Sequence, residues 1–164
     1  MDQYLVRIAR QLLLGVALSL GVVGCGGGAN DALDALPSAI DVAQRQAEVG
    51  VTALNWSDAD LQRLSVRGAA LYKQCRVCHQ IGAGAQHRSG PSLNQVVGRK
   101  AGSAAGFSYS TAMRSSDFVW DEAALDAWLA RPWRFLPGTS MQYGGISDAE
   151  DRRAMIAYLV TASE

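Results

Sequence analysis

The chain has 164 residues, and its 15 Lys and Arg balance 15 Asp and Glu, so the formal net charge is zero. The charge is uneven, because residues 25–66 carry six acids and two bases while residues 67–164 carry eight acids and eleven bases. This length leaves room for one domain with a targeting segment and a linker, and it excludes a second sizeable core. No basic run interleaved with aromatic residues occurs, which argues against nucleic-acid binding.

Residues 1–24 predict an export signal. Arg7 and Arg10 form a basic start, and the apolar stretch that follows them is too short for an ordinary transmembrane helix. The sequence from Val22 to Cys25 resembles a bacterial lipobox, which implies cleavage before Cys25 and a lipid on that residue. An uncleaved signal anchor and simple secretion remain open, and all three interpretations place the chain beyond the cytoplasmic membrane.

Residues 25–55 are Gly-rich at first and then acidic and Ala-rich, with a single proline at Pro37. The apolar positions could form a short amphipathic helix, but they are sparse. We therefore expect a flexible tether of roughly thirty residues between the lipid and one domain at 56–164. A helix that docks on a partner subunit is the alternative.

Three helices are predicted in the domain. The first begins at Ser57, which forms a capping-box pattern with Asp60. The second spans 121–130, and the third begins at Ser147 with Glu150 as its capping partner. Gly68 inside the first helix indicates a close crossing with the last one. The glycine-rich span 82–106 is expected to be loop, and a loop of this length in a small domain indicates that it wraps a ligand.

The sequence Cys75-Arg76-Val77-Cys78-His79 is typical of a c-type haem attachment site. One helical turn between the cysteines brings both thiols to the two vinyl groups on one porphyrin edge. The imidazole of the next residue then points at the iron. The motif therefore predicts two thioether bonds to haem c and one iron ligand.

Two other chemistries use Cys-x-x-Cys. A zinc site would have to recruit His79 and His87, which puts all four ligands within thirteen residues and without the usual separating span. A thioredoxin-like site would need a strand leading into Cys75, whereas Gly68, Leu71 and Tyr72 fit a helix. Both are disfavoured.

With these features, residues 66–159 resemble a class I cytochrome c of the bacterial, monohaem kind, over about 95 of the 164 residues. The resemblance implies a mostly α fold of three to five short helices with long loops wrapped around one covalently attached haem. The segments that carry it are Gly68 with Leu71-Tyr72, Cys75 to His79, Gly90-Pro91-Ser92-Leu93, Gly98-Arg99, Gly106 to Ser110, Trp120, Trp128-Leu129, Pro132, Pro137 to Met141 and Ile156 to Leu159.

The resemblance also implies the two axial ligands of the iron, His79 on one side and Met141 on the other. A ligating imidazole donates its second N–H to a fixed acceptor, and the family assigns that position to the carbonyl of Pro91. His87 is expected to make a hydrogen bond between loops instead of binding the iron.

The same resemblance predicts polar partners for a buried haem propionate, since a buried carboxylate without partners is costly. Tyr109 and Trp120 would donate hydrogen bonds to it, and Arg99 would supply positive charge nearby. Trp128 stands where many relatives carry Tyr, so we expect it to pack and not to bond the methionine.

These features predict an electron carrier with no catalytic residues, in which the iron changes between ferric and ferrous and keeps both ligands. We expect a lipoprotein on the periplasmic side of a membrane that relays electrons between a dehydrogenase or quinol-oxidising complex and a terminal oxidase or reductase. A dedicated haem subunit of one complex and a haem sensor or peroxidase with an open sixth position are the alternatives. A docking face is expected from four basic residues around the haem edge, Lys73, Arg76, Arg88 and Lys100.

Overall fold

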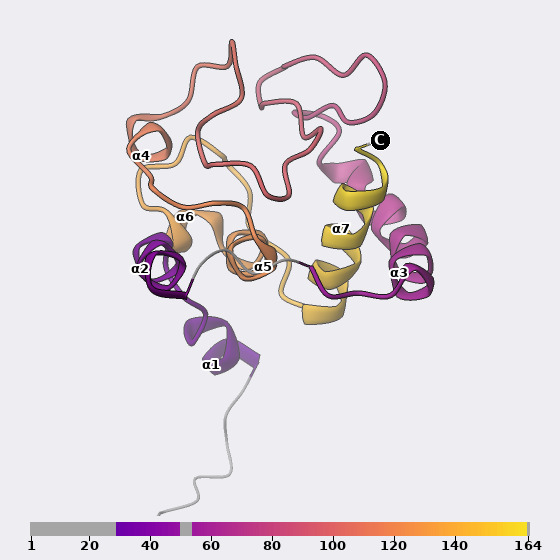
Figure 1. The fold of residues 1–164 in the computed structure, drawn as a ribbon, viewed down its shortest axis with the longest axis horizontal. Coiled ribbons are helices and arrows are strands. Elements are labelled where there is room, and N and C mark those ends of the chain that lie inside the picture. Colours follow the sequence, from indigo (N-terminus) through magenta and orange to yellow (C-terminus); the bar gives the residue numbers. More distant parts are fainter. Residues whose placement is uncertain (1–28, 50–53, 164) are drawn as a thin grey trace, which may run out of the picture.

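The computed structural model describes residues 29–49 and 54–163; the predicted signal at 1–24 and the lipidation site Cys25 lie outside this part (Figure 1). The helices are α1 (Ala29–Asp34), α2 (Ala39–Val49), α3 (Asp58–Leu71), the 3-10 turn η1 (Tyr72–Gln74), α4 (Thr111–Arg114), α5 (Glu122–Ala130), α6 (Pro132–Phe135) and α7 (Ala149–Thr161). Within the described ranges the only β-type pairing is one isolated antiparallel bridge, between Lys100 and Val119. The predicted mostly α class is confirmed, with five α-helices from residue 54 onward.

The crossing of α3 and α7 is as close as Gly68 predicts. A Cβ atom at Gly68 would lie 2.2 Å from the carbonyl oxygen of Ala154 and 2.6 Å from Cβ of Tyr158. Hence α3 can lie against α7 only because this position has no side chain. The predicted start of α3 is also confirmed, since the Ser57 hydroxyl accepts a hydrogen bond from the Asp60 N–H at 3.1 Å.

The predicted start of α7 is wrong by one residue. Asp148 and not Ser147 is the N-cap, and its carboxylate accepts a hydrogen bond from the N–H of Asp151 at 2.8 Å. Both residue types can cap a helix, but a carboxylate also interacts favourably with the positive end of the helix dipole. The residues three positions on, Glu150 and Asp151, are both acidic, so the pattern alone did not discriminate.

α6 follows α5 after a single residue, and the loop that carries Met141 comes next in the chain. Asp121 caps α5 through a 2.9 Å hydrogen bond from the N–H of Ala124, and Pro132 starts α6 at a position where its missing N–H costs nothing. The apolar side chains of α5 are buried, as its spacing predicts. The loop that carries Met141 follows directly from α6.

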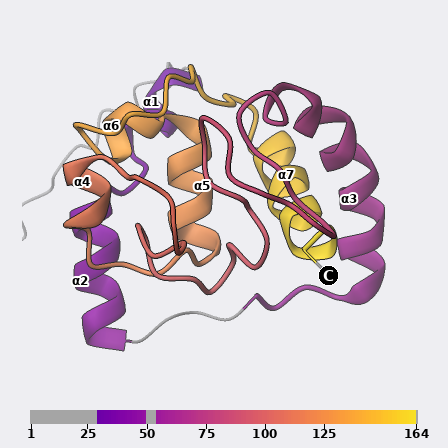
Figure 2. The ribbon, with the colours of Figure 1, turned by 90° about the horizontal axis from the view of Figure 1, so that it is seen from above.

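Residues 79–110 contain no helix and form the loops that lie above α5 and α7 in Figure 1 and on the viewer's side of them in Figure 2. The prediction of a long loop is therefore confirmed. Two interior hydrogen bonds fold it back on the haem motif, since the Gly90 N–H donates to the carbonyl of Cys78 and the Leu93 N–H donates to that of Gln80, both at 2.9 Å.

The structure differs from the expected mobile tether over residues 29–49. This segment forms α1 and α2, and its side chains Leu33, Ala39 and Val42 are at most 8% exposed. Asp34 forms ion pairs with Arg131 and Arg134, which come much later in the sequence. The sparse apolar positions suffice because they are buried against the domain and are reinforced by ion pairs, neither of which a local pattern reveals.

Among the described residues no helix is both long and apolar enough to cross a bilayer.

Candidate functional site

A cavity of about 370 Å³ lies between the loops, α5, α7 and the segment 139–143. Its size is in the range of small-molecule and cofactor sites. All nine residues predicted for the haem site line it: Cys75, Cys78, His79, Pro91, Arg99, Tyr109, Trp120, Trp128 and Met141. Chain positions up to 66 residues apart therefore meet at one place.

A second, more open hollow of about 580 Å³ shares His79 and Tyr72 with this cavity. It is lined by Arg76, Gln80 and Arg88 but by neither cysteine and not by Met141. We place the site in the smaller cavity, because only this cavity is lined by both cysteines together with His79 and Met141, two side chains that can bind iron.

The imidazole of His79 is held in one tautomer. Its Nδ1 lies 2.7 Å from the carbonyl oxygen of Pro91, which can only accept, so Nδ1 carries the proton and donates it. Burial lowers the pKa of His79, and the hydrogen bond to Pro91 opposes this only in part. The ring is therefore neutral, and its Nε2 lone pair is free to bind a metal.

Two neighbours fix the position of His79. A Cβ atom on Gly90 would lie 2.4 Å from Cε1 of the imidazole, so only glycine leaves room for the ring. The Tyr72 hydroxyl donates a 3.0 Å hydrogen bond to the backbone carbonyl of His79. Burial raises the pKa of Tyr72 to about 12, so this hydroxyl keeps its proton at neutral pH.

The two cysteines follow η1 in a single helical turn. The N–H of Cys78 donates to the carbonyl of Cys75 at 3.1 Å, and that of His79 donates to the same carbonyl at 2.9 Å. Cys75 is half-buried and Cys78 is exposed, and neither forms a disulfide. Burial raises the pKa of Cys75 to about 11, so its thiol is protonated at neutral pH. The turn gives both thiols and the imidazole the spacing that the motif requires.

Met141 is half-buried in a loop that is fixed at both ends. On one side Gly138 turns the chain with φ of +86°, and the N–H of Met141 donates to the Thr139 hydroxyl at 3.2 Å. On the other side the N–H of Ile146 donates to the carbonyl of Leu129 in α5 at 2.8 Å. The loop therefore presents the thioether to the cavity from a defined backbone.

The donor set on the far wall fits a carboxylate-bearing cofactor. Arg99 donates to the carbonyls of Asn94 at 2.9 Å and Ser92 at 3.2 Å, but its Nε is buried and has no partner among the described protein groups. A buried N–H of a guanidinium is costly unless an acceptor meets it. Tyr109 and Trp120 line the same cavity, and a haem propionate would supply the acceptor.

A family model described as Cytochrome c matches residues 65–163, about 60% of the chain. The chain belongs to the cytochrome c family. Cytochrome c2 of Rhodomicrobium vannielii is 48% identical over 96 residues, which is 58% of this chain and 77% of that protein. Cytochrome c of Ulva intestinalis is 40% identical over 98 residues, 59% of this chain and 88% of that one.

Among solved structures, cytochrome cH from Methylobacterium extorquens is similar with a TM-score of 0.56 and 40% identity, over 59% of this chain and 97% of that one. Proteins of the cytochrome c family carry electrons on one covalently attached haem c and are not enzymes. The family match begins at residue 65, so α1 and α2 lie outside it.

As a cytochrome c, the protein has an aromatic cluster behind the cavity wall. Trp128 lies with its ring centroid 5.3 Å from that of Trp120 and 6.0 Å from that of Phe135, in edge-to-face arrangements. Trp128 is 8% exposed. Packing accounts for its position, in line with the prediction for this residue.

His87 ties two loops together, as predicted. Its Nδ1 accepts a 2.9 Å hydrogen bond from the N–H of Ser92, so the proton is on Nε2, which donates to the carbonyl of Ala105 at 2.8 Å. Both ring nitrogens are thus used by backbone groups.

Sequence reasoning missed three contributors to this site. Tyr72 and Gly90 were part of the family pattern, but their contacts with His79 are visible only in the structure. Gln46 of α2 bonds the backbone of Val119, next to Trp120, and no local signal connects these residues 73 positions apart. Of the predicted basic docking face, Lys100 pairs with Asp117 at 2.8 Å, and Lys73, Arg76 and Arg88 are exposed.

Proposed function

We propose that this cytochrome c is a membrane-tethered carrier of single electrons on the periplasmic side of a bacterial membrane, with His79 and Met141 as the axial ligands of its haem iron. The observation that carries the proposal is the tautomer of His79. Its proton is on Nδ1, in the hydrogen bond to Pro91, and Nε2 is therefore the free lone pair at a cavity that Met141 also lines.

When bound, haem c supplies one reversible electron at its iron. Cys75 and Cys78 would hold its edge by thioether bonds, and His79 and Met141 would close both axial positions so that no substrate binds there. A thioether ligand raises the reduction potential relative to a second imidazole. Arg99, Tyr109 and Trp120 would hold and partly neutralise a propionate.

The remaining lining keeps water away from the cofactor. Apolar side chains cover much of the cavity wall, and exclusion of water disfavours the extra positive charge of ferric iron. These residues are Leu93, Val96, Met113, Leu125, Leu129, Met155 and Leu159.

The partners and the tether are part of the same proposal. A lipid on Cys25 would attach the protein to the membrane, and the exposed Lys73, Arg76 and Arg88 would meet acidic faces of a dehydrogenase or quinol-oxidising complex and of a terminal oxidase or reductase. Such carriers form brief complexes with small interfaces. The dedicated-subunit alternative is less well supported, because Leu33, Ala39 and Val42 are buried against the protein's own domain and are not free to dock elsewhere.

The test is the visible spectrum of the purified holoprotein in both redox states, with and without carbon monoxide. We expect a low-spin spectrum that carbon monoxide does not change in the wild type, and carbon monoxide binding in Met141→Ala. Met113→Ala is the matched control, because Met113 is buried and lines the same cavity. It should stay closed to carbon monoxide. Ready binding by the wild type would contradict the carrier and favour gas sensing or peroxide chemistry.

A further inference from the structure

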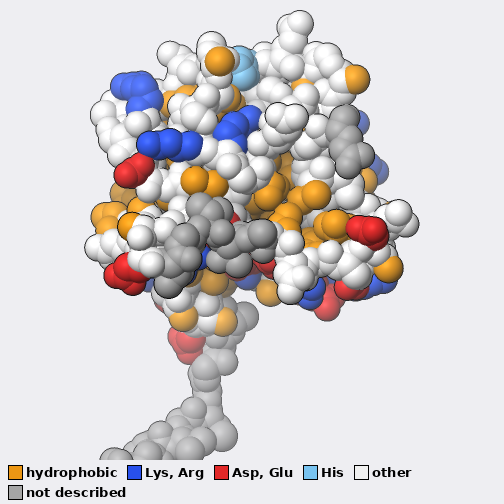
Figure 3. Space-filling model, viewed as in Figure 1, with side chains coloured by type: hydrophobic (Ala, Val, Ile, Leu, Met, Phe, Trp, Pro, Cys, Tyr) orange, Lys and Arg blue, Asp and Glu red, His pale blue; other side chains and the backbone are white. Residues whose placement is uncertain are grey.

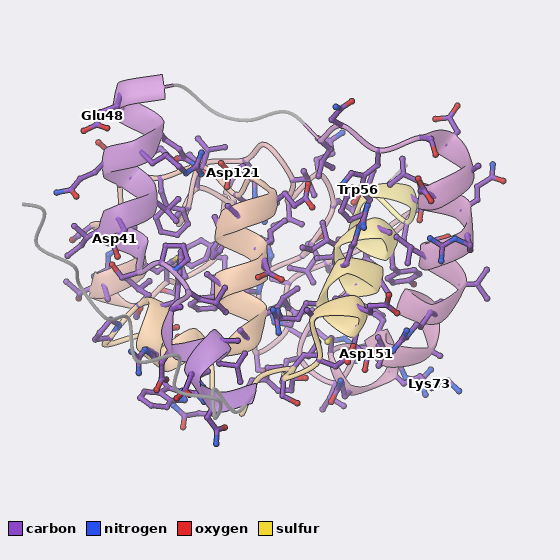
Figure 4. All side chains as sticks on the ribbon, turned by 90° about the horizontal axis from the view of Figure 1, so that it is seen from below. Asp41, Glu48, Trp56, Lys73, Asp121 and Asp151 are labelled. Carbon is purple, nitrogen blue, oxygen red and sulfur yellow. The ribbon has the colours of Figure 1, made fainter. Side chains whose placement is uncertain are left out.

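The segment 29–49, which we call the mount, is attached to the domain at both of its helices. In α1, Leu33 is 8% exposed and Asp34 pairs with Arg131 at 2.5 Å and with Arg134 at 3.0 Å. In α2, Val42 is buried and Arg45 pairs with Asp121 at 2.5 Å. Figure 4 shows Asp121 at the start of α5, next to α2. The mount therefore holds a fixed position on the domain.

The chain between the proposed lipid and the mount is short. Cys25 and Ala29 are four residues apart, and four fully extended residues span at most about 14 Å. A domain of this size is roughly 35 Å across. Whatever the conformation of residues 26–28, the start of α1 stays within less than half a domain diameter of a lipid on Cys25.

Figure 1 shows α1 at one end of the molecule and the loops of residues 79–110 at the opposite end. With α1 close to the bilayer, the loop end points away from it. A spacer of about 14 Å is too short to let the domain turn over and bring those loops to the lipid surface.

The end of the molecule near α1 also carries an aromatic side chain suited to a bilayer surface. Trp133 of α6 is 60% exposed, and in the sequence it stands between Arg131 and Arg134, the two residues that pair with Asp34 of α1. Ile40, at the start of α2, is 70% exposed. Tryptophan is favoured at membrane interfaces because its ring is apolar and its N–H is polar.

The opposite end has the charge that an anionic membrane attracts. Residues 79–110 contain no Asp or Glu and three basic residues, Arg88, Arg99 and Lys100, of which Lys100 pairs with Asp117. In Figure 3 the uppermost charged side chains of the visible face are basic, with one acidic side chain just below them. Attraction to anionic lipid acts only within about a Debye length, about 8 Å at physiological ionic strength. On a long flexible tether this end would be drawn onto the membrane, and on a short spacer it is kept out of range.

We propose that the mount holds the domain on the bilayer surface by its α1–α6 end, with Trp133 in contact with lipid, and keeps the basic loop end free for an acidic protein partner in the aqueous compartment. This inference rests on the proposed lipidation of Cys25. A flexible tether would let the domain move over tens of ångströms, whereas the short spacer and the mount give the domain one orientation on the bilayer.

The test uses the full-length, haem-loaded, lipidated protein in vesicles of phosphatidylethanolamine and phosphatidylglycerol. Photoreactive benzoylphenylalanine replaces Trp133 in one variant and Ala105, in the loop end, in another. We expect lipid adducts at 133 and none at 105, as measured by mass spectrometry. Adducts at 105, or vesicle-bound protein with none at 133, would overturn the orientation.

Lengthening the spacer tests whether its short length is the cause of the orientation. About twenty Gly and Ser residues inserted between Gly28 and Ala29 add a root-mean-square span of about 25 Å. The lengthened protein should still sediment with vesicles, and it should now form adducts at 105 that disappear at high salt. An unchanged adduct pattern would show that the short spacer does not set the orientation, and it would overturn the proposal.

Point variants test the mount itself. Asp34→Ala removes both ion pairs of α1 and should reduce adducts at 133, whereas Asp31→Ala, an exposed acid on the same helix, should not. Equal effects would contradict the role of Asp34. The intact mass and vesicle sedimentation of every variant report lipidation separately. A protein without lipid that stays in solution would refute the lipidation of Cys25 and this inference with it, while the spectral test of the haem ligands would be unaffected.

Discussion

The side-chain amide of Gln46 makes both hydrogen bonds that a neighbouring β-strand would make to Val119. Its Nε2 donates to the Val119 carbonyl at 2.9 Å, and its Oε1 accepts from the Val119 N–H at 2.8 Å. On the other edge of the same segment, Trp120 exchanges 2.9 Å hydrogen bonds with Gly98 and Arg99. Residues 119–120 are therefore held between α2, which lies outside the family match, and the backbone beside Arg99 in the cavity wall.

Gln46→Ala should lower the free energy of unfolding by about 2 kcal/mol, since it removes two hydrogen bonds from partly buried backbone groups. Guanidinium chloride titration of the oxidised holoprotein measures this. Gln44→Ala is the matched control, because Gln44 is an exposed residue on the same helix, and it should stay within about 0.5 kcal/mol of the wild type. Equal stability of the two variants would mean that the Gln46 contacts do not hold α2 in place.

The Gln46→Ala variant also tests whether the hydrogen bonds to residues 119–120 position Trp120 toward a haem propionate. Loss of the donor would raise the propionate pKa, so the pH dependence of the midpoint potential in Gln46→Ala should move to higher pH than in the wild type. Potentiometric titration over a range of pH measures this. A destabilised variant with an unchanged pH profile would leave Gln46 with a purely structural role.

Asp121 should make part of the stability dependent on acid pH. Burial alone would raise the pKa of Asp121, but the hydrogen bonds from Arg45 and the Ala124 N–H outweigh it, and the pKa lies below its ordinary value of 3.8. An acid with a lowered folded-state pKa contributes stability above its unfolded value, and this contribution is lost as the pH falls through the folded value. The difference in melting temperature between wild type and Asp121→Asn should therefore be largest near neutral pH and shrink below about pH 4.

Asp58→Asn is the control for this acid dependence, since Asp58 is exposed in the first turn of α3. Its difference from the wild type should change far less over the same pH range. A constant Asp121→Asn difference from neutral pH to pH 3 would contradict the assigned role of the carboxylate.

The features that the sequence predicted are local, whereas the feature that it did not predict depends on contacts between residues far apart in the chain. The Cys75 to His79 motif, the helix cap at Ser57, the helix expected over 121–130 and the crossing at Gly68 depend on local spacing or on one residue type, and the structure has each of them. The position of α2 depends on contacts of Arg45 and Gln46 with residues more than 70 positions away. No periodicity records such contacts, so the segment was expected to be a tether.

Arg152 joins α7 to α5 and to the end of the Met141 loop from a buried position. It is 5% exposed, pairs with Asp126 at 2.7 Å, and donates to the carbonyls of Ile146 at 3.1 Å and Ser147 at 2.8 Å. Arg152→Met should lower the free energy of unfolding by about 3 to 5 kcal/mol, because it leaves a partly buried carboxylate and two carbonyls without partners. Denaturant unfolding of the holoprotein gives the value.

Two further variants distinguish the loss of the Arg152–Asp126 ion pair from a general destabilisation of α7. Arg153→Met changes the next residue, which is exposed and lies 5.0 Å from the Trp56 ring centroid, and it should cost about 1 kcal/mol or less. The double variant Arg152→Met with Asp126→Leu should regain part of the loss, because no charge is then left unpaired. A double variant less stable than Arg152→Met would contradict this account.

The adjacent glycines 144 and 145 offer a final test, because only one of them is crowded. A Cβ atom at Gly145 would lie 1.9 Å from the carbonyl oxygen of Ala130, and its φ is +98°, whereas nothing lies within 4 Å of such an atom at Gly144. Gly145→Ala must therefore push the Met141 loop away from the end of α5. We expect a loss of at least about 2 kcal/mol in unfolding free energy.

If Met141 closes the iron, the displaced loop in Gly145→Ala should also let ferrous haem bind carbon monoxide, which the visible spectrum detects. Gly144→Ala should remain closed to carbon monoxide and should be as stable as the wild type or up to about 1 kcal/mol more stable. Because the two substitutions are chemically identical and adjacent, any difference between them arises from the contact with Ala130 and the backbone angle. Carbon monoxide binding by both variants, or by neither despite the lost stability of Gly145→Ala, would separate the packing of this loop from ligation by Met141.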